Sequence, residues 1–281
     1  MRRTRHKIAV FSDLTDSMLS LLKSSVSLAQ MIDGEIEVFN VTKPTQIIGK
    51  DNQLSAIRTI NREYILTDKR MRDIVSPISE DYGVPISYTS TFGNVKAEIA
   101  RYLSDNEPDV IVLGRKKIKP FNTINDRITN FVLRTFKGSV MIVSEQNSIE
   151  PGKKIGIGML NCSGELNNSP FSETLFTCAN SPLKSFNIID SSKTQMQPFQ
   201  FLGQKTVNYV FDYNQNTIKT LPTYLSMSNI DLLFIERKRK ENHSIPAISN
   251  MYDMAKKLGV TLMITGEKRT NYEYQSNLQI A

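Results

Sequence analysis

The chain has 281 residues, a formal net charge of +7 and 40% hydrophobic residues, so it is long enough for two domains of about 100–150 residues each. The basic excess is spread over both halves, which is weak evidence for nucleic acid, so we expect no nucleic-acid partner. Cys162 and Cys178 have no CxxC spacing and only two histidines accompany them, which argues against a zinc site or a disulfide framework, so we expect no metal.

The N-terminal apolar run, Ile8–Phe11, is shorter than the core of about 7–15 residues that a signal peptide needs. No stretch of the chain approaches the length of about 20 apolar residues that a membrane-spanning helix needs. We therefore expect a cytoplasmic protein that does not contact a membrane.

Apolar strands alternate with amphipathic helices through the first half of the chain. Strands are predicted over Lys7–Phe11, Glu35–Val41, Pro85–Thr91, Asp109–Leu113 and Ser139–Val143. Helices are predicted over Asp16–Ile32, Gln53–Tyr82, Gly93–Asn106 and Asn122–Phe136. This alternation predicts a parallel sheet with right-handed crossovers and helices on both faces.

Helical spacing also predicts which side chains face the sheet. In the first helix these include Leu19, Leu22 and Val26. In the long second helix they are Ile57, Ile60, Tyr64, Met71, Ile74 and Ile78. Pro77 is expected to end or kink the last turns of that helix, because proline removes a backbone donor.

After a linker at Gln146–Gly152 the same pattern begins again. Strands are predicted over Lys154–Met159, Ser185–Asp190, Lys205–Phe211, Asp231–Ile235 and Val260–Thr265, and helices over Ser169–Ala179, Asn216–Met227 and Ser244–Leu258. Three pairs of stretches align, namely Asp109–Gly114 with Asp231–Glu236, Arg115–Lys119 with Arg237–Lys240, and Thr135–Glu145 with Lys257–Glu267. The prediction is an α/β chain of two tandem, doubly wound, five-stranded parallel-sheet domains, residues 1–146 and 152–281, the second one degenerate.

Three stretches of the first half carry a family resemblance: VFSDLT at Val10–Thr15, FNV at Phe39–Val41, and the segment Phe92–Gly114. Together they resemble the universal stress protein family, whose five-stranded domain is often doubled. In nucleotide-binding members, the positions of Asp13 and Val41 hold the nucleoside. The resemblance also implies that fifth strands meet across a dimer axis, which here would join Val140–Val143 to Thr261–Ile264 within one chain.

The ATP-binding branch of the family carries Gly-x2-Gly-x9-Gly-Ser/Thr after the fourth strand. Gly114 matches the first position, but the second glycine falls near Lys116 or Lys117 and the last pair near Asp126-Arg127. A phosphate would lose backbone donors there and meet a carboxylate, at a cost of about 1–4 kcal/mol for charges about 4 Å apart. In the second repeat Glu236 replaces the first glycine. The resemblance therefore supports the fold and argues against ATP as a cofactor.

Two local features keep alternative interpretations. The basic loop with Arg115, Lys116, Lys117 and Lys119 is either solvated or grips a phosphate through side chains, and the lack of interleaved aromatics weakens a nucleic-acid interpretation. Asp13 either caps the first helix or contacts a ribose hydroxyl.

No serine–histidine–acid set is apparent, so we expect no catalysis. The main hypothesis is a non-catalytic stress-response protein that acts as a homo-oligomer or intrachain pseudo-dimer through protein contacts. The alternative is a nucleotide or phosphometabolite sensor whose ligand residues are Asp13, Val41, Gly114, Arg115 and Lys117.

Overall fold

The computed structural model describes residues 5–43, 53–115, 124–145, 147–162, 171–189, 205–212, 215–237 and 259–266. The strands of the first half are β1 His6–Ser12, β2 Gly34–Thr42, β3 Ile86–Phe92, β4 Val110–Arg115 and β5 Ser139–Ser144. Those of the second half are β6 Ile157–Leu160, β7 Leu183–Ile189, β8 Thr206–Asp212, β9 Leu232–Ile235 and β10 Thr261–Ile264. The described helices are α1 Met18–Ile32, α2 Gln53–Tyr82, α3 Val95–Asn106, α4 Ile124–Thr135, α5 Ser172–Thr177 and α6 Gln215–Met227.

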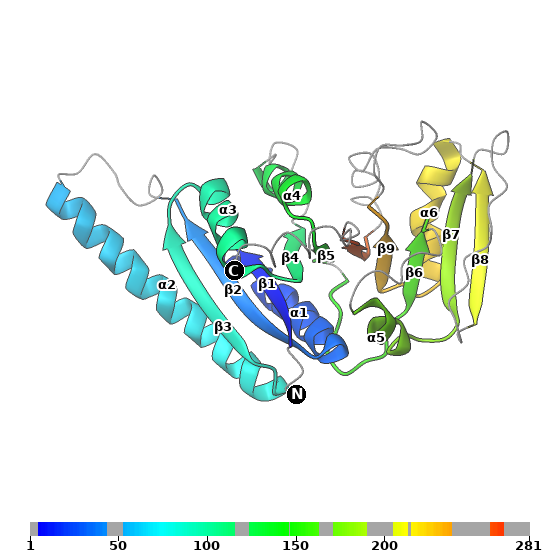
Figure 1. Ribbon diagram of the computed structural model, residues 1–281, viewed down its shortest axis with the longest axis horizontal. Coiled ribbons are helices and arrows are strands. Elements are labelled where there is room, and N and C mark those ends of the chain that lie inside the picture. Colours follow the sequence, from blue (N-terminus) through cyan, green and yellow to red (C-terminus); the bar gives the residue numbers. More distant parts are fainter. Residues whose placement is uncertain are drawn as a thin grey trace, which may run out of the picture.

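All strands of the described residues join one ten-stranded sheet in the order β3-β2-β1-β4-β5-β10-β9-β6-β7-β8 (Figure 1). Pairing is parallel within each half. In both halves the strands lie side by side in the order third, second, first, fourth, fifth, counted along the chain from the outer edge of the sheet to its centre. The predicted α/β fold with a parallel sheet in each half is therefore confirmed. The predicted helix at Ser244–Leu258 lies outside the described residues, and the boundary between residues 1–146 and 152–281 stays a prediction.

The halves meet where β5 pairs antiparallel with β10, a junction that we call the seam. Met141 lies opposite Met263, which is its counterpart in the repeat alignment, and Ile142 lies opposite Leu262. An antiparallel pair in which equivalent residues face each other has a local two-fold axis between them. The expectation that Val140–Val143 and Thr261–Ile264 meet within one chain is thus confirmed.

Hydrogen bonds at the two ends of the seam repeat this symmetry. The Ser144 N–H donates to Thr261 Oγ1 at 3.2 Å, and the Gly266 N–H donates to Ser139 Oγ at 3.2 Å. Ser139 aligns with Thr261, and Ser144 aligns with Gly266, so each bond is the counterpart of the other. Ser139 and Thr261, whose hydroxyls accept these two bonds, are both buried and belong to the packed interior of the seam.

The core has one layer on each face of the sheet, and both layers cross the seam. One layer packs under α1, α2 and α5 and contains Ile8, Val38 and Met71 together with Phe176 and Phe234. The other packs under α3, α4 and α6 and joins residues of both halves in the same way. Below the seam, α1 packs against α5, and Lys23 pairs with Glu150 at 3.2 Å. The two halves therefore share their hydrophobic cores as well as a sheet.

Three of the side chains predicted to face the sheet are exposed instead. Leu19 on α1 is 52% exposed, because Met18 and Leu21 face the sheet in its place. On α2, Met71 and Ile78 are buried as expected, but Ile57 and Tyr64 are exposed. The amino-terminal part of α2 extends past the sheet (Figure 1). Tyr64 lies beside Phe92, the last residue of β3, with ring centroids 6.3 Å apart, and remains half exposed.

The predicted helix over Gln53–Tyr82 is confirmed, with Pro77 inside it, so Pro77 does not end the helix. Asn94 is the N-cap of α3, and its side chain accepts hydrogen bonds from the N–H groups of Lys96 and Ala97. No described helix is long and apolar enough to cross a bilayer.

Candidate functional site

Four of the five predicted ligand residues lie along one edge of the first-half sheet. β1 is hydrogen-bonded to β2 on one side and to β4 on the other, all parallel, so their carboxyl ends meet. Asp13 follows β1, Val41 lies near the end of β2, and Gly114 and Arg115 end β4. Lys117, with the rest of the basic loop, lies outside the described residues. This carboxyl edge is where open α/β sheets bind ligands.

The segment between β1 and α1 is stabilised by hydrogen bonds among its own residues. The Thr15 hydroxyl donates to Asp13 Oδ1 at 2.9 Å, and the Leu14 N–H donates to Ser12 Oγ at 3.1 Å. Leu14 has φ of +55°, in the left-handed region that L residues rarely adopt. The N-cap of α1 is Ser17, so the expected role of Asp13 as that cap is wrong. Asp13 is exposed at the carboxyl edge.

The packing around position 114 has room for a side chain, so it does not require a glycine there. A Cβ built there would meet only the Leu21 side chain, at 3.9 Å, which is ordinary contact. The residue is paired within the sheet, opposite Val143 of β5. In glycine-rich anion sites the glycines lie in a loop that leads into a helix, whereas Gly114 is still paired within β4.

Arg115 reaches across the seam into the second half. Its Nη2 donates to the Val260 carbonyl oxygen at 2.9 Å. Its repeat counterpart, Arg237, donates from Nη1 to the Phe136 oxygen at 2.5 Å and from Nη2 to the Gly138 oxygen at 3.4 Å. Gly138 and Val260 are themselves counterparts in the repeat alignment. The first cation of each predicted basic loop therefore binds the backbone of the opposite half.

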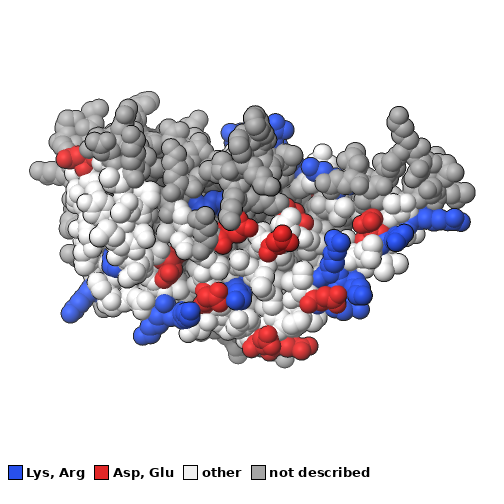
Figure 2. All heavy atoms as spheres, turned by 180° about the vertical axis from the view of Figure 1, so that it is seen from behind, with Lys and Arg blue, Asp and Glu red and all other residues white. Residues whose placement is uncertain are grey.

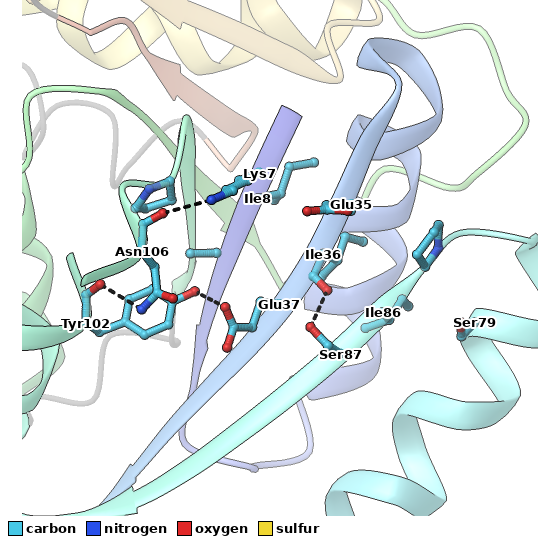
Figure 3. A pocket seen from close by; sticks show the side chains of 13 residues that line it. Lys7, Ile8, Glu35, Ile36, Glu37, Ser79, Ile86, Ser87, Tyr102 and Asn106 are labelled. Carbon is cyan, nitrogen blue, oxygen red and sulfur yellow. Dashed lines mark hydrogen bonds between the residues drawn. The ribbon is translucent and has the colours of Figure 1, made fainter. Parts of the chain in front are cut away.

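A second site, which we did not predict, is a hollow of about 550 Å³ at the amino ends of β1, β2 and β3 (Figure 3). We call it the amino-end groove. The side chains of Glu35 and Glu37 project from β2, and Tyr102 and Asn106 project from α3 toward them. Lys7 Nζ donates to the Asn106 carbonyl oxygen at 3.4 Å. The groove lies at the opposite edge of the sheet from Asp13 and Gly114.

Glu37 is the centre of the hydrogen bonding in the amino-end groove. Its Oε2 accepts the Tyr102 hydroxyl at 2.7 Å, and its Oε1 accepts the Thr89 hydroxyl at 2.8 Å. Burial raises the pKa of Tyr102, and the hydrogen bond to Glu37 and the charge of that carboxylate raise it further. The Tyr102 ring also stacks on Phe39, with centroids 4.4 Å apart. Tyr102 is thus a fixed neutral donor at the wall of the groove.

One sequence signal pointed to this groove. Glu35 and Glu37 alternate along a strand, which places both carboxylates on one face of the sheet. The partner Tyr102 lies far away in the sequence, on a helix that periodicity predicts to be amphipathic, and only the packing of α3 on β2 brings it to Glu37.

The described residues hold no group of three or more His, Cys, Asp or Glu side chains that could bind a metal ion. On the face shown in Figure 2, the Lys and Arg side chains are interspersed with Asp and Glu. The described residues visible on that face therefore form no single-sign patch of the kind that steers nucleic acid.

The family model of the universal stress proteins matches residues 4–144. The chain belongs to the universal stress protein family. A search of curated proteins gave no match.

Solved structures resemble the chain over nearly its whole length. A universal stress protein from Archaeoglobus fulgidus DSM 4304 has a TM-score of 0.63 at 12% identity, covering 94% of this chain and 97% of that one. A protein of unknown function from Pseudomonas aeruginosa PAO1 has a TM-score of 0.56 at 10% identity, with coverages of 99% and 98%. A putative universal stress protein from Pseudomonas aeruginosa UCBPP-PA14 has a TM-score of 0.52 at 10% identity, with coverages of 93% and 92%. At these identities the likeness shows the fold alone.

Proposed function

We propose that this universal stress protein is a non-catalytic cytoplasmic protein that acts through contacts with other proteins, its two halves forming an internal pair in place of a dimer. Membership in the family supports a stress-related function. The more specific parts of the proposal are the internal pairing, the lack of ATP binding and the lack of catalysis.

The reciprocal seam is the observation that carries the proposal. Arg115 and Arg237 each follow the fourth strand of their half, where an anion-binding loop would begin, and each donates to carbonyl oxygens of the opposite half. Each guanidinium thus uses at least one of its five N–H donors to join the two halves of the chain. The position therefore favours a structural role in joining the halves.

Two features of the carboxyl edge support the lack of ATP binding. Gly114 continues β4 as a paired residue, so its N–H is not presented in a loop. The Asp13 carboxylate accepts a hydrogen bond from Thr15 within its own segment. Neither feature offers the converging backbone donors that a triphosphate requires.

Calorimetric titration of the full chain with ATP and Mg²⁺ tests the proposal. We expect no measurable heat of binding and no rise in melting temperature at millimolar nucleotide. A ligand present at 100 times its Kd would stabilise the protein by about 2.7 kcal/mol, which thermal melting detects readily. Micromolar binding would overturn the proposal.

A second candidate function, a nucleotide or phosphometabolite sensor, is favoured by one observation. Asp13, Val41 and Gly114 come from three adjacent strands and meet at the edge where the fold binds ligands. Mass spectrometry of gently purified protein would show whether a nucleotide co-purifies with it. If one does, Asp13→Asn should weaken its binding, whereas Asp16→Asn, an exposed carboxylate in the same segment, should not.

A further inference from the structure

The amino-end groove carries more negative than positive charge. The charged side chains that line it are those of Lys7, Glu35 and Glu37. No ion pair between described residues involves either glutamate. Glu37 accepts hydrogen bonds from two hydroxyl groups, those of Tyr102 and Thr89, and both donors are neutral. These donors fix the direction of the Glu37 carboxylate but leave its charge uncompensated.

Glu35 adds a second carboxylate at a defined distance from the first. It is exposed, and its side chain makes no hydrogen bond with the described part of the chain. Glu35 and Glu37 alternate along β2 and project to the same side, toward α3 (Figure 3). At about 3.3 Å per residue, their points of attachment are about 6.6 Å apart. The groove therefore presents two carboxylates that are spaced for two separate positive charges.

The second half of the chain places an ammonium group at the counterpart of this groove. β1 and β2 pair Ala9 with Glu37, and β6 and β7 pair Gly158 with Lys184. Because Ala9 and Gly158 lie opposite the same position of the fourth strand, Lys184 is the counterpart of Glu37. Lys184 Nζ donates to the Ser228 carbonyl oxygen at the end of α6. One half thus supplies its own ammonium group at this position, where the other half has a carboxylate beside a hollow.

The end of the helix that covers the groove also attracts ammonium groups. Asn106 of α3 and Ser228 are counterparts, because each precedes a residue in the left-handed conformation. These two left-handed residues are Glu107 and Asn229, with φ of +44° and +49°. The Asn106 carbonyl oxygen accepts Lys7 Nζ at 3.4 Å, as Ser228 accepts the lysine of β7. The last turn of this helix, whose carbonyl groups carry partial negative charge, therefore binds an ammonium group in both halves.

We propose that the amino-end groove binds a small aliphatic diammonium compound. One ammonium group pairs with Glu37, in the position that Lys184 takes in the second half, and the other pairs with Glu35. A chain of four methylenes places its two nitrogens about 6 Å apart, given bonds of about 1.5 Å, which matches the spacing of the two carboxylates. The whole chain carries a net charge of +7, so the molecule in general repels a dication and the binding has to come from local contacts. This site goes beyond the proposed protein contacts and lies at the other edge of the sheet from Asp13.

Calorimetric titration of the full chain with 1,4-diaminobutane tests this proposal. We expect equimolar binding with submillimolar affinity, which added salt weakens because the carboxylates are partly solvated. 1-Aminobutane, with a single charge, should bind about 5-fold more weakly, and 1,4-butanediol, with no charge, should give no heat of binding. A parent chain that binds no diamine, or that binds the diamine and the monoamine equally well, would overturn the proposal.

Three substitutions test whether the diamine lies in this groove. Glu37→Gln should raise the Kd about 10-fold or more, which corresponds to the loss of one charge-assisted hydrogen bond. Glu35→Gln should raise the Kd about 5-fold and remove the preference for the diamine over the monoamine. Because the Glu35 side chain is exposed and has no hydrogen bond to lose, this variant should fold like the parent. Lys7→Gln removes a positive charge from the groove and should tighten binding.

The control is an exposed carboxylate at the other edge of the sheet. Asp16→Asn should bind the diamine like the parent. Thermal melting without ligand shows that each variant is folded. Weaker binding by Lys7→Gln, or a loss in Asp16→Asn as large as that in Glu35→Gln, would show that the diamine binds elsewhere and that the proposal is wrong. The two proposals fail separately, because ATP binding would overturn the proposed function and leave this site standing, whereas a chain that binds neither ligand would do the reverse.

Discussion

Replacing Arg237 with methionine should loosen the seam and lower the stability of the whole chain. The guanidinium donates to the carbonyl oxygens of Phe136 and Gly138 on the opposite half, and only 8% of the residue is exposed. Methionine keeps much of the side-chain volume but cannot donate. Two carbonyl oxygens at the entry to β5 would lose their cross-seam donor.

The expected magnitude follows from these contacts. A hydrogen bond from a charged donor contributes about 1.5–3 kcal/mol, and the 3.4 Å contact adds little to the 2.5 Å one. We therefore expect Arg237→Met to cost about 2–3 kcal/mol of unfolding free energy. Arg115→Met, which removes one 2.9 Å bond from a half-buried residue, should cost about 1–2 kcal/mol. Arg237→Lys keeps the positive charge, but an ammonium group cannot donate to both carbonyl oxygens in the way that a planar guanidinium can. Its stability should therefore lie between that of the parent and that of Arg237→Met.

Calorimetry and hydrogen exchange together measure this effect. At about 2–4 °C per kcal/mol, Arg237→Met should melt about 4 °C or more below the parent. The amides of Met141 and Met263, at the centre of the seam, should exchange faster than in the parent, whereas amides of β1 should not. Arg134→Gln, an exposed arginine on α4, is the control and should melt within about 1 °C of the parent. Unchanged exchange at the seam together with a shift as small as that of Arg134→Gln would refute the argument.

Three further changes have definite expected outcomes. Glu107→Gly should raise stability by about 1 kcal/mol in urea unfolding, because Glu107 is the exposed C-cap of α3 at φ of +44°. Asp105→Gly, inside the helix, should instead lower it by about 0.3 kcal/mol. Tyr102→Phe should cost about 1–2 kcal/mol by removing the donor to Glu37. The pKa of Tyr102 is higher in the folded protein than in the unfolded chain, where it is about 10. Its contribution to stability is therefore complete below about pH 10 and is lost as the pH rises further. Above about pH 10, the parent should lose more stability in urea unfolding than Tyr102→Phe does. Gly156→Ala should cost about 3 kcal/mol by thermal melting, because the new Cβ would lie 1.8 Å from a backbone oxygen, and a loss below about 1 kcal/mol would contradict the path of the chain into β6.

The candidate site could be predicted only in part. The alternation of elements predicts parallel strands, whose carboxyl ends share one edge of the sheet. The observed strand order then brings Asp13, Val41 and Gly114 together at that edge. What Arg115 contacts could not be predicted, because charge and spacing describe a side chain and not its partner. That partner, Val260, belongs to the other half and becomes available only when β10 pairs with β5.

The sequence alone determined the strands, the helices and the doubling of the pattern, since strand alternation and helical spacing are local properties of the chain. Tertiary structure alone decided what each face meets. The same apolar spacing buries Met71 and exposes Ile57, because periodicity defines the direction of a side chain and only the extent of the sheet defines whether anything lies there. In the same way, Glu37 became the centre of a groove only when α3 brought Tyr102 to it, and two arginines became seam residues only when the two halves joined into one sheet.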